Sequence, residues 1–114
     1  MLLRGRIVFP PGERPDQAAR VVARVEEVSL ADAPAATVAE QVREHVALPR
    51  GESFSLPFEI PIDPGSIDPG HRYSVRVHVD VTGTSTVTSD DFVSTAAHPL
   101  TFESGGMAVD VRRV

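Results

Sequence analysis

Hydrophobic residues occupy every second position in two neighbouring stretches of this chain. The first stretch carries them at Phe54, Leu56, Phe58, Ile60 and Ile62. The same spacing returns in the second stretch, at Tyr73, Val75, Val77, Val79 and Val81. Side chains of a β-strand point alternately to opposite faces, so each stretch predicts a strand with one buried and one exposed face. The connection over 63–70, which is rich in Pro and Gly, is typical of an antiparallel pair that covers a core.

Shorter runs predict further strands on both sides of this pair. These strands are expected over residues 3–9, 20–28, 86–94 and 107–114, with a short strand or extended link around Leu100 and Phe102. Glu26 and Glu27 interrupt the alternation of the second strand. A β-bulge at these residues would return Val28 to the inner face.

Residues 37–48 fit two kinds of secondary structure. Val38, Val42 and Val46 recur every four residues, and the Ala, Glu, Gln and Arg between them favour a helix. A strand would place alternate residues on one face, namely Val38, Glu40, Val42, Glu44 and Val46. The strand is preferred, because its neighbours are strands and a lone helix would have to leave the sheet.

Seven to eight short strands separated by turn signals predict an all-β fold, a single-domain antiparallel β-sandwich over residues 1–114. A chain of 114 residues fits one such domain and buries enough surface to fold without disulfides. The expected core consists of Ile7, Val21, Val25, Leu56, Phe58, Ile60, Tyr73, Val75, Val77, Val79 and Val109.

Composition excludes several classes of function. The net charge is −5, all eleven basic residues are Arg, and they are scattered along the chain. Nucleic-acid binding normally needs a basic face, so no nucleic-acid partner is expected. The sequence contains no Cys, which excludes disulfides, thiolate metal sites, a Cys nucleophile and a lipid attached through Cys.

The apolar runs are too short for a transmembrane segment, and the first residues lack the apolar region of a signal peptide. The chain as written is therefore expected to be cytoplasmic and without a lipid anchor. The alternative interpretation of Met1 is a start codon that was added to a trimmed domain.

Three groups of residues were considered for catalysis or metal binding. The four histidines, His45, His71, His78 and His98, lack the close spacing of structural zinc ligands and are expected at the surface. Ser89 with Asp90 and Asp91 lacks a nucleophile elbow, so the two carboxylates are expected to be solvated at a bulge or strand end. Glu26 and Glu27 point to opposite faces of a strand and cannot flank one glycosidic bond unless a bulge turns them together.

Two further motifs have structural explanations. Asp63 and Asp68 each precede Pro and Gly, and each is expected to open a turn by accepting a hydrogen bond from its own backbone. Gly105-Gly106 precedes a strand rather than a helix and so does not form a phosphate loop. No catalytic, cofactor-binding or metal-binding residue is predicted, no cofactor is expected, and the protein is not expected to be an enzyme.

An open sandwich leaves edge strands whose backbone groups are unpaired. Such an edge can accept a strand from a partner protein, and a groove between the sheets can take an apolar group. The ligand-binding residues and the identity of the edge strands are not evident from the pattern.

Four segments, taken in order, resemble a known family. They are Arg24 to Pro34 (R-V-E-E-V-S-L-A-D-A-P), Val38 to Gln41 (V-A-E-Q), Pro57 to Pro64 (P-F-E-I-P-I-D-P) and Ile67 to Arg76 (I-D-P-G-H-R-Y-S-V-R). Together they resemble the YbaY/YscW family of small envelope lipoproteins, over roughly residues 6–114.

The resemblance implies a compact β-sandwich in the cell envelope or periplasm. It also implies a role like that of type III secretion pilotins, lipid-anchored chaperones that bind a secretin and guide it to the outer membrane. The leading hypothesis is a non-catalytic, chaperone-like module that holds a peptide segment or apolar group against its sheet. The alternatives are a carbohydrate-related or enzyme-accessory domain, which the scarcity of aromatic residues disfavours, and a purely structural module.

Overall fold

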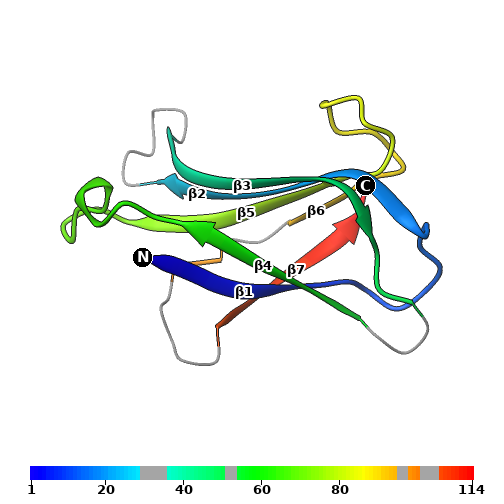
Figure 1. Cartoon of the computed structure of the whole chain (residues 1–114), viewed down its shortest axis with the longest axis horizontal. Coiled ribbons are helices and arrows are strands. Elements are labelled where there is room, and N and C mark those ends of the chain that lie inside the picture. The colour runs from blue at the N-terminus through cyan, green and yellow to red at the C-terminus, as the bar shows by residue number, and fades with distance from the viewer. Residues whose placement is uncertain (29–35, 51–53, 95–97, 101–105) are drawn as a thin grey trace.

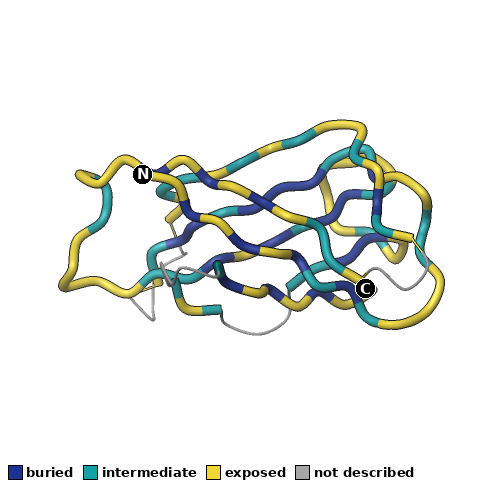
Figure 2. Tube along the Cα trace, turned by 60° about the horizontal axis from the view of Figure 1, so that its bottom comes forward, coloured by how far each residue is buried: buried dark blue, intermediate teal, exposed yellow. Residues whose placement is uncertain are grey.

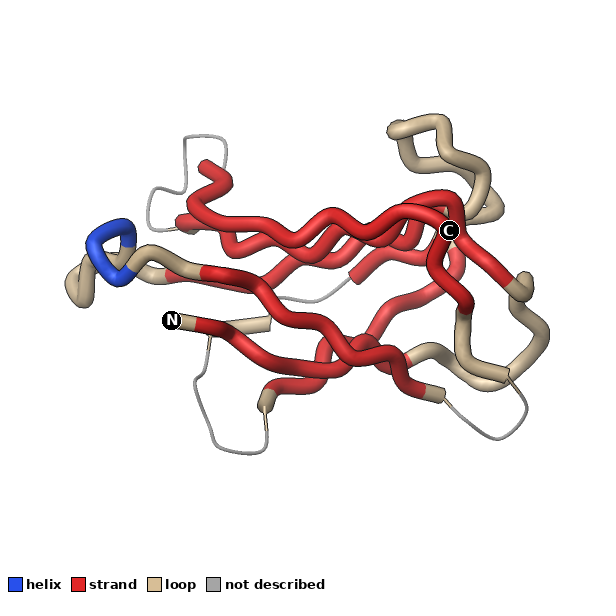
Figure 3. Tube along the Cα trace, in the orientation of Figure 1, coloured by secondary structure: helices blue, strands red, loops and turns tan. Residues whose placement is uncertain are grey.

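The computed structural model describes residues 1–28, 36–50, 54–94, 98–100 and 106–114. In these residues strands dominate, with one short 3-10 helix between β4 and β5 (Figures 1 and 3). The elements are β1 (Leu2–Val8), β2 (Gln17–Glu27), β3 (Ala36–Ala47), β4 (Ser55–Pro61), η1 (Pro64–Ser66), β5 (Tyr73–Asp80), β6 (Phe92–Ser94) and β7 (Met107–Arg113). The prediction of an all-β fold is confirmed.

The seven strands form one sheet in the order β3-β2-β5-β6-β7-β1-β4. Neighbouring strands are antiparallel, except that β1 and β7 run parallel. The sheet curls so that β4, β1 and β7 lie across from β3, β2 and β5 (Figure 1). The two layers expected of a sandwich are therefore two halves of one continuous sheet, which is nearly closed into a barrel.

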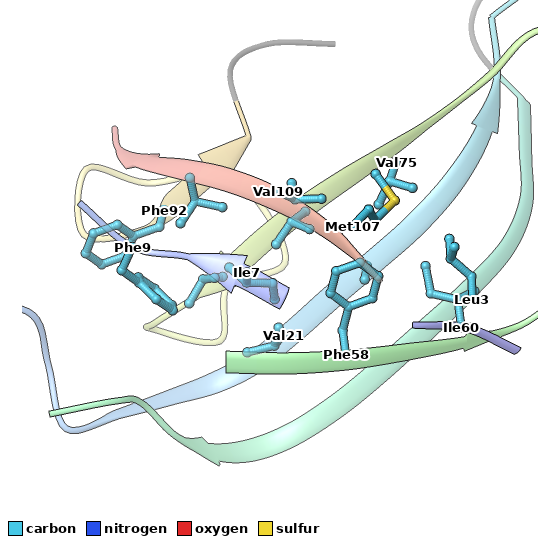
Figure 4. Close-up of a cluster of buried hydrophobic side chains, with 14 of the residues drawn as sticks. Leu3, Ile7, Phe9, Val21, Phe58, Ile60, Val75, Phe92, Met107 and Val109 are labelled. Carbon is cyan, nitrogen blue, oxygen red and sulfur yellow. The ribbon is translucent and has the colours of Figure 1, made fainter. Parts of the chain in front are cut away.

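The core lies between the two halves and follows the alternation of the strands (Figure 2). Along β1, Leu3, Gly5 and Ile7 are buried and the residues between them are less so. Figure 4 shows the core side chains of both halves converging, with Phe58 and Ile60 from β4 facing Val21 and Val75 from the opposite half. The predicted core residues lie in or against this cluster, with Leu56 and Tyr73 only partly buried. The cluster also contains residues outside the predicted set, including Leu3, Phe9, Leu48, Phe92, Met107 and Val111.

Residues 36–47 form strand β3, so the helical alternative is wrong and the strand prediction is right. The predicted face is only partly correct. Glu40, Val42 and Glu44 point outward, whereas Val38 and Val46 pack against the core. The pairing of β2 with β3 shifts at Val25/Glu26, opposite Val38, and His45 has a positive φ of 52°. These two irregularities turn the ends of the strand inward.

The bulge predicted at Glu26 and Glu27 lies elsewhere. The pairing of β2 with β5 runs without a shift through both residues, and the extra residue opposite Val25/Glu26 belongs to β3. Val28 therefore does not return to the inner face and is 38% exposed.

The strand predicted over residues 86–94 is much shorter in the structure. Only Phe92–Ser94 forms a strand, of which Phe92 and Val93 pair with β5, and residues 81–91 form a loop at the end of the sheet. Pro99 makes a single bridge to Ser74, beside Leu100, which packs against the core. Phe102 lies outside the described residues.

Candidate functional site

The two end strands of the sheet, β3 and β4, face each other along a line that we call the seam. No ladder of backbone hydrogen bonds joins them in the described sheet. Two side chains from β3 cross the seam instead. The Gln41 Oε1 atom accepts a hydrogen bond from the Glu59 backbone N–H at 3.0 Å, and Arg43 Nη2 donates to the Pro57 carbonyl oxygen at 2.8 Å. The barrel is thus closed here by side chains.

The seam-facing edge of β4 has few free backbone donors. Next to the two ends of β4, the Phe54 carbonyl accepts a hydrogen bond from the Phe9 N–H, and the Ile62 N–H donates to the Met1 carbonyl. The even-numbered residues on the β4 side thus carry the backbone hydrogen bonds to β1. The backbone N–H and C=O groups of the odd-numbered residues of β4 therefore point toward the seam. Pro57 and Pro61 have no N–H, and the N–H of Glu59 is already bonded to Gln41. A partner strand would find little to pair with on β4, whereas β3 contains no proline.

Arg43 lies on the inner face of β3, because its pairing partner in β2 is the buried residue Val21. A hollow of about 210 Å³ opens beside it, lined by Gln41, Arg43, Pro57, Phe58 and Glu59. The Arg43 Nε atom is enclosed by protein and has no hydrogen-bond partner. Burial lowers the pKa of Arg43, because the charged form loses contact with water.

A second hollow of about 350 Å³ lies on the outer face of β2, β5 and β6, beside the 81–91 loop. Val22, Val87 and Val93 line it, and Val87 is 54% exposed. Arg24 and Arg76 at its rim are paired with Glu40 and Glu26, at 3.2 Å in each case. This hollow is mainly apolar, and its charged rim is already neutralised.

The 81–91 loop is held by two buried carboxylates. Asp80 accepts hydrogen bonds from the N–H groups of Gly83 and Ser85, at 2.9 and 3.0 Å. Asp91 is 0% exposed and accepts from the N–H groups of Val81 and Thr88, at 2.9 and 3.1 Å.

His78 completes this arrangement, with its Nε2 atom 2.8 Å from Asp91 Oδ2. Burial opposes ionisation of Asp91, but the hydrogen bonds from His78, Thr88 and Val81 and the charge attraction of His78 outweigh it and lower its pKa. One ligand atom from each of His78, Asp80 and Asp91 lies within 4.8 Å of the others, a spacing that a metal ion could use. Each carboxylate oxygen, however, already accepts a backbone hydrogen bond from the 81–91 loop. We therefore interpret the cluster as structural and call His78, Asp80 and Asp91 the brace of the loop.

The brace corrects two predictions. His78 was expected at the surface with the other histidines, but its side chain is only 17% exposed beneath the loop. Asp91 was expected to be solvated and is instead enclosed. Asp90 does remain exposed and lies 3.7 Å from Arg113, and Ser89 is exposed beside it.

Of the other candidate residues, Glu27, Asp68 and His71 lie together, because His71 contacts both carboxylates, and the rest are dispersed. Asp63 and Asp68 open turns as predicted, each accepting a hydrogen bond from the N–H two residues ahead, at 3.0 and 2.8 Å. Glu26 binds Arg76, and Glu27 contacts His71 at 2.9 Å. His45 is exposed, and His98 Nε2 accepts from the Asp110 N–H. Gly105 lies outside the described residues, and Gly106 precedes β7 with a φ of 74°.

Sequence reasoning missed Gln41 and Arg43, the two residues that cross the seam. One available signal was the pair Pro57 and Pro61, four residues apart in a strand, because proline in a sheet is typical of an edge. The position of β3 on the other side of that edge had no comparable signal.

No helix in the described part of the chain is long and apolar enough to cross a membrane.

Comparisons with known proteins agree with this fold. The family model for type III secretion system lipoprotein chaperones (YscW) matches residues 2–104. The chain is also similar to a solved structure described as an alternative pilotin from the type II secretion system of Vibrio cholerae. That similarity has a TM-score of 0.74 at 22% sequence identity and covers 100% of this chain and 96% of the pilotin. No curated protein gave a match. The strands, the core and the family match together show that this chain belongs to the YscW family of type III secretion system lipoprotein chaperones.

Proposed function

We propose that this chain is a non-catalytic, pilotin-like chaperone that holds an extended segment of a secretin by adding it as a strand to β3 at the seam. The observation that carries the proposal is the seam itself. It brings the two end strands of the described sheet together and leaves them joined by the side chains of Gln41 and Arg43 instead of a ladder. An edge of this kind can pair with an extended peptide through its main chain.

The two edges differ in their backbone N–H donors, and this difference favours β3 as the strand that pairs with the bound segment. Pro57 and Pro61 remove donors from the β4 edge, which protects it against strand addition. Strand β3 is longer, at 12 residues, and contains no proline. Every residue whose backbone points to the seam therefore has an N–H group. A bound segment would displace the hydrogen bonds of Gln41 and Arg43 and continue the sheet from β3.

The family and the similar structure support a secretin as the source of the bound segment. Members of the family are described as secretion-system chaperones, and the similar structure is described as a pilotin. Chaperones of this kind act by binding a partner protein and not by transforming a substrate. A secretin is the partner that the resemblance of the sequence to pilotins implies.

Closing the seam with a covalent link tests the proposal. Val42 and Glu59 are exposed on the outer faces of β3 and β4, and the chain has no cysteine of its own. In the double variant Val42→Cys/Glu59→Cys, a short reagent that joins two thiols is expected to abolish binding of overlapping synthetic peptides that cover the secretin of the same organism. Binding is measured by fluorescence anisotropy before and after cross-linking.

The matched control is Arg4→Cys/Glu59→Cys, which uses the same cysteine on β4 but joins it to its paired strand β1. This link is expected to leave peptide binding unchanged, because β1 and β4 are already hydrogen-bonded. Equal binding by the closed-seam and control proteins would refute strand addition at the seam.

A further inference from the structure

We propose that the segment accepted at the seam carries an Asp or Glu side chain whose carboxylate is bound by Arg43. This inference rests on the proposed function and names the chemistry of the partner.

Arg43 differs from five of the eleven arginines in having no ion pair within the described chain. Arg4, Arg24, Arg50, Arg76 and Arg113 each lie within ion-pair distance of an Asp or Glu, at 3.4, 3.2, 2.7, 3.2 and 3.7 Å. Arg43 has no such partner among the described acidic residues, and neither have Arg6, Arg20 and Arg112. Of these four arginines, Arg43 is the one with an enclosed nitrogen atom that has no hydrogen-bond partner. Glu59, the acidic residue across the seam, has its carboxylate 3.4 Å from Arg4 on the outer face.

The donors of Arg43 are only partly used. Its Nη2 atom donates to the neutral Pro57 carbonyl, and its enclosed Nε atom has no partner. Even the partial burial of a cation without a counter-charge is unfavourable, because the charge gives up some of its hydration. A carboxylate would supply both a counter-charge and two oxygens that match the planar fork of a guanidinium group.

The surrounding charges restrict where the acidic residue can lie on the segment. Arg43 is on the inner face of β3, while Glu40 and Glu44 point to the outer face. Side chains of an added strand alternate between the same two faces. An acidic residue that points inward would meet Arg43, whereas one at the next position would approach Glu40 or Glu44. The carboxylate is therefore expected at a single register.

A side-chain carboxylate of the bound segment fits the position of Arg43 better than the C-terminal carboxylate of that segment. Arg43 lies within β3, with strand residues on both sides of it along the seam. A segment laid along β3 would continue past Arg43 in both directions, so its own terminus need not reach the guanidinium group.

The test uses the tightest-binding peptide from the secretin scan. Each Asp or Glu of that peptide is replaced in turn by Asn or Gln, and the dissociation constants are measured against the native protein, Arg43→Gln and Arg24→Gln. One amide replacement is expected to weaken binding to the native protein by roughly tenfold to a hundredfold, the usual effect of losing a charge-assisted hydrogen bond. Arg43→Gln is expected to weaken the original peptide by a similar factor and to make binding insensitive to that replacement.

Arg24→Gln is the matched control, because it removes an outer-face arginine paired with Glu40. It is expected to change binding by less than about twofold, as for an exposed ion pair. Arg43→Lys keeps the charge but not the fork and is expected to bind with intermediate affinity. If Arg43→Gln does not fold, the peptide replacements against the native protein and Arg43→Lys still decide the question.

The outcomes separate this inference from the proposed function. If no acidic residue of the peptide matters while cross-linking the seam still prevents binding, the carboxylate inference is wrong and seam binding stands. If cross-linking has no effect on binding, the proposed function itself fails. If amidation of the peptide's C-terminus alone removes binding, the carboxylate belongs to a chain end and the side-chain assignment is overturned.

Discussion

Gly5 shows how one small residue controls the packing of the barrel. A Cβ atom at this position would lie 2.5 Å from Phe58 Cζ and 2.6 Å from the Met107 carbonyl oxygen. Both distances are shorter than the van der Waals contacts that close-packed interiors tolerate. Only glycine leaves room at this position of β1 for both the Phe58 ring and the Met107 carbonyl group.

Gly5→Ala is therefore expected to lower the free energy of unfolding by about 1–3 kcal/mol, the usual effect of overpacking a core. Urea denaturation followed by circular dichroism measures the change. Gly65→Ala is the control, because the nearest atom to its added Cβ, Asp63 Oδ1, is 3.4 Å away in an exposed turn. Equal stability of the two variants would show that Phe58 relaxes without cost.

At the scale of structural elements, the 81–91 loop is held by the side chains of Asp80 and Asp91. Asp80 and Asp91 accept backbone hydrogen bonds from four of its residues, and Asp91 is joined to β5 through His78. The pKa of Asp91 in the folded chain lies below its ordinary value of 3.8. A lowered pKa means that folding favours the carboxylate, so this contribution is complete well above 3.8 and disappears as pH falls through the folded pKa.

Asp91→Asn is expected to flatten the loss of stability that begins as pH falls below about 5 and continues through the lowered pKa of Asp91, because the substituted side chain takes up no proton. The variant should also be less stable than the native chain near neutral pH, since the charge-assisted bond to His78 is lost. Thermal melting at a series of pH values measures both effects. Asp90→Asn, at the exposed neighbour, should retain the native acid profile. An unchanged profile in Asp91→Asn would exclude the brace as the acid-sensitive element.

The whole barrel depends on contacts between its two halves. Phe58 lies in β4, is only 2% exposed, and faces residues of β2 and β5 in the other half of the sheet (Figure 4). Its ring therefore joins strands that are far apart in the chain. A domain of this size is stable by only about 5–15 kcal/mol, so one such contact is a large part of the total.

Phe58→Ala is expected to lower the free energy of unfolding by about 3–5 kcal/mol, through lost burial and the cavity that remains. Phe54→Ala removes the same side chain from a site that is 45% exposed beside Arg14, and is expected to have a much smaller effect. Guanidinium denaturation of both variants gives the comparison. Similar losses would mean that the halves are held together mainly by other contacts.

The alternation of side chains was enough to predict most of the strands and about half of the buried core. Whether Ile60 or Val77 points inward depends on the pleat of its own strand, which is a local property. The turns at Asp63 and Asp68 were predictable for the same reason, because each hydrogen bond spans two residues. The family was recognisable because its motifs are contiguous segments.

The seam and the brace became visible only in three dimensions. The hydrogen bond from Glu59 N–H to Gln41 joins residues 18 positions apart, and the contact between His78 and Asp91 joins residues 13 apart. Which strands end the sheet, and which polar side chains are enclosed as it curls, depend on how all seven strands pair and not on any one of them. Local periodicity thus dictated the strands and their buried faces, whereas closure of the sheet placed Gln41 and Arg43 opposite β4 and brought His78 and Asp91 together.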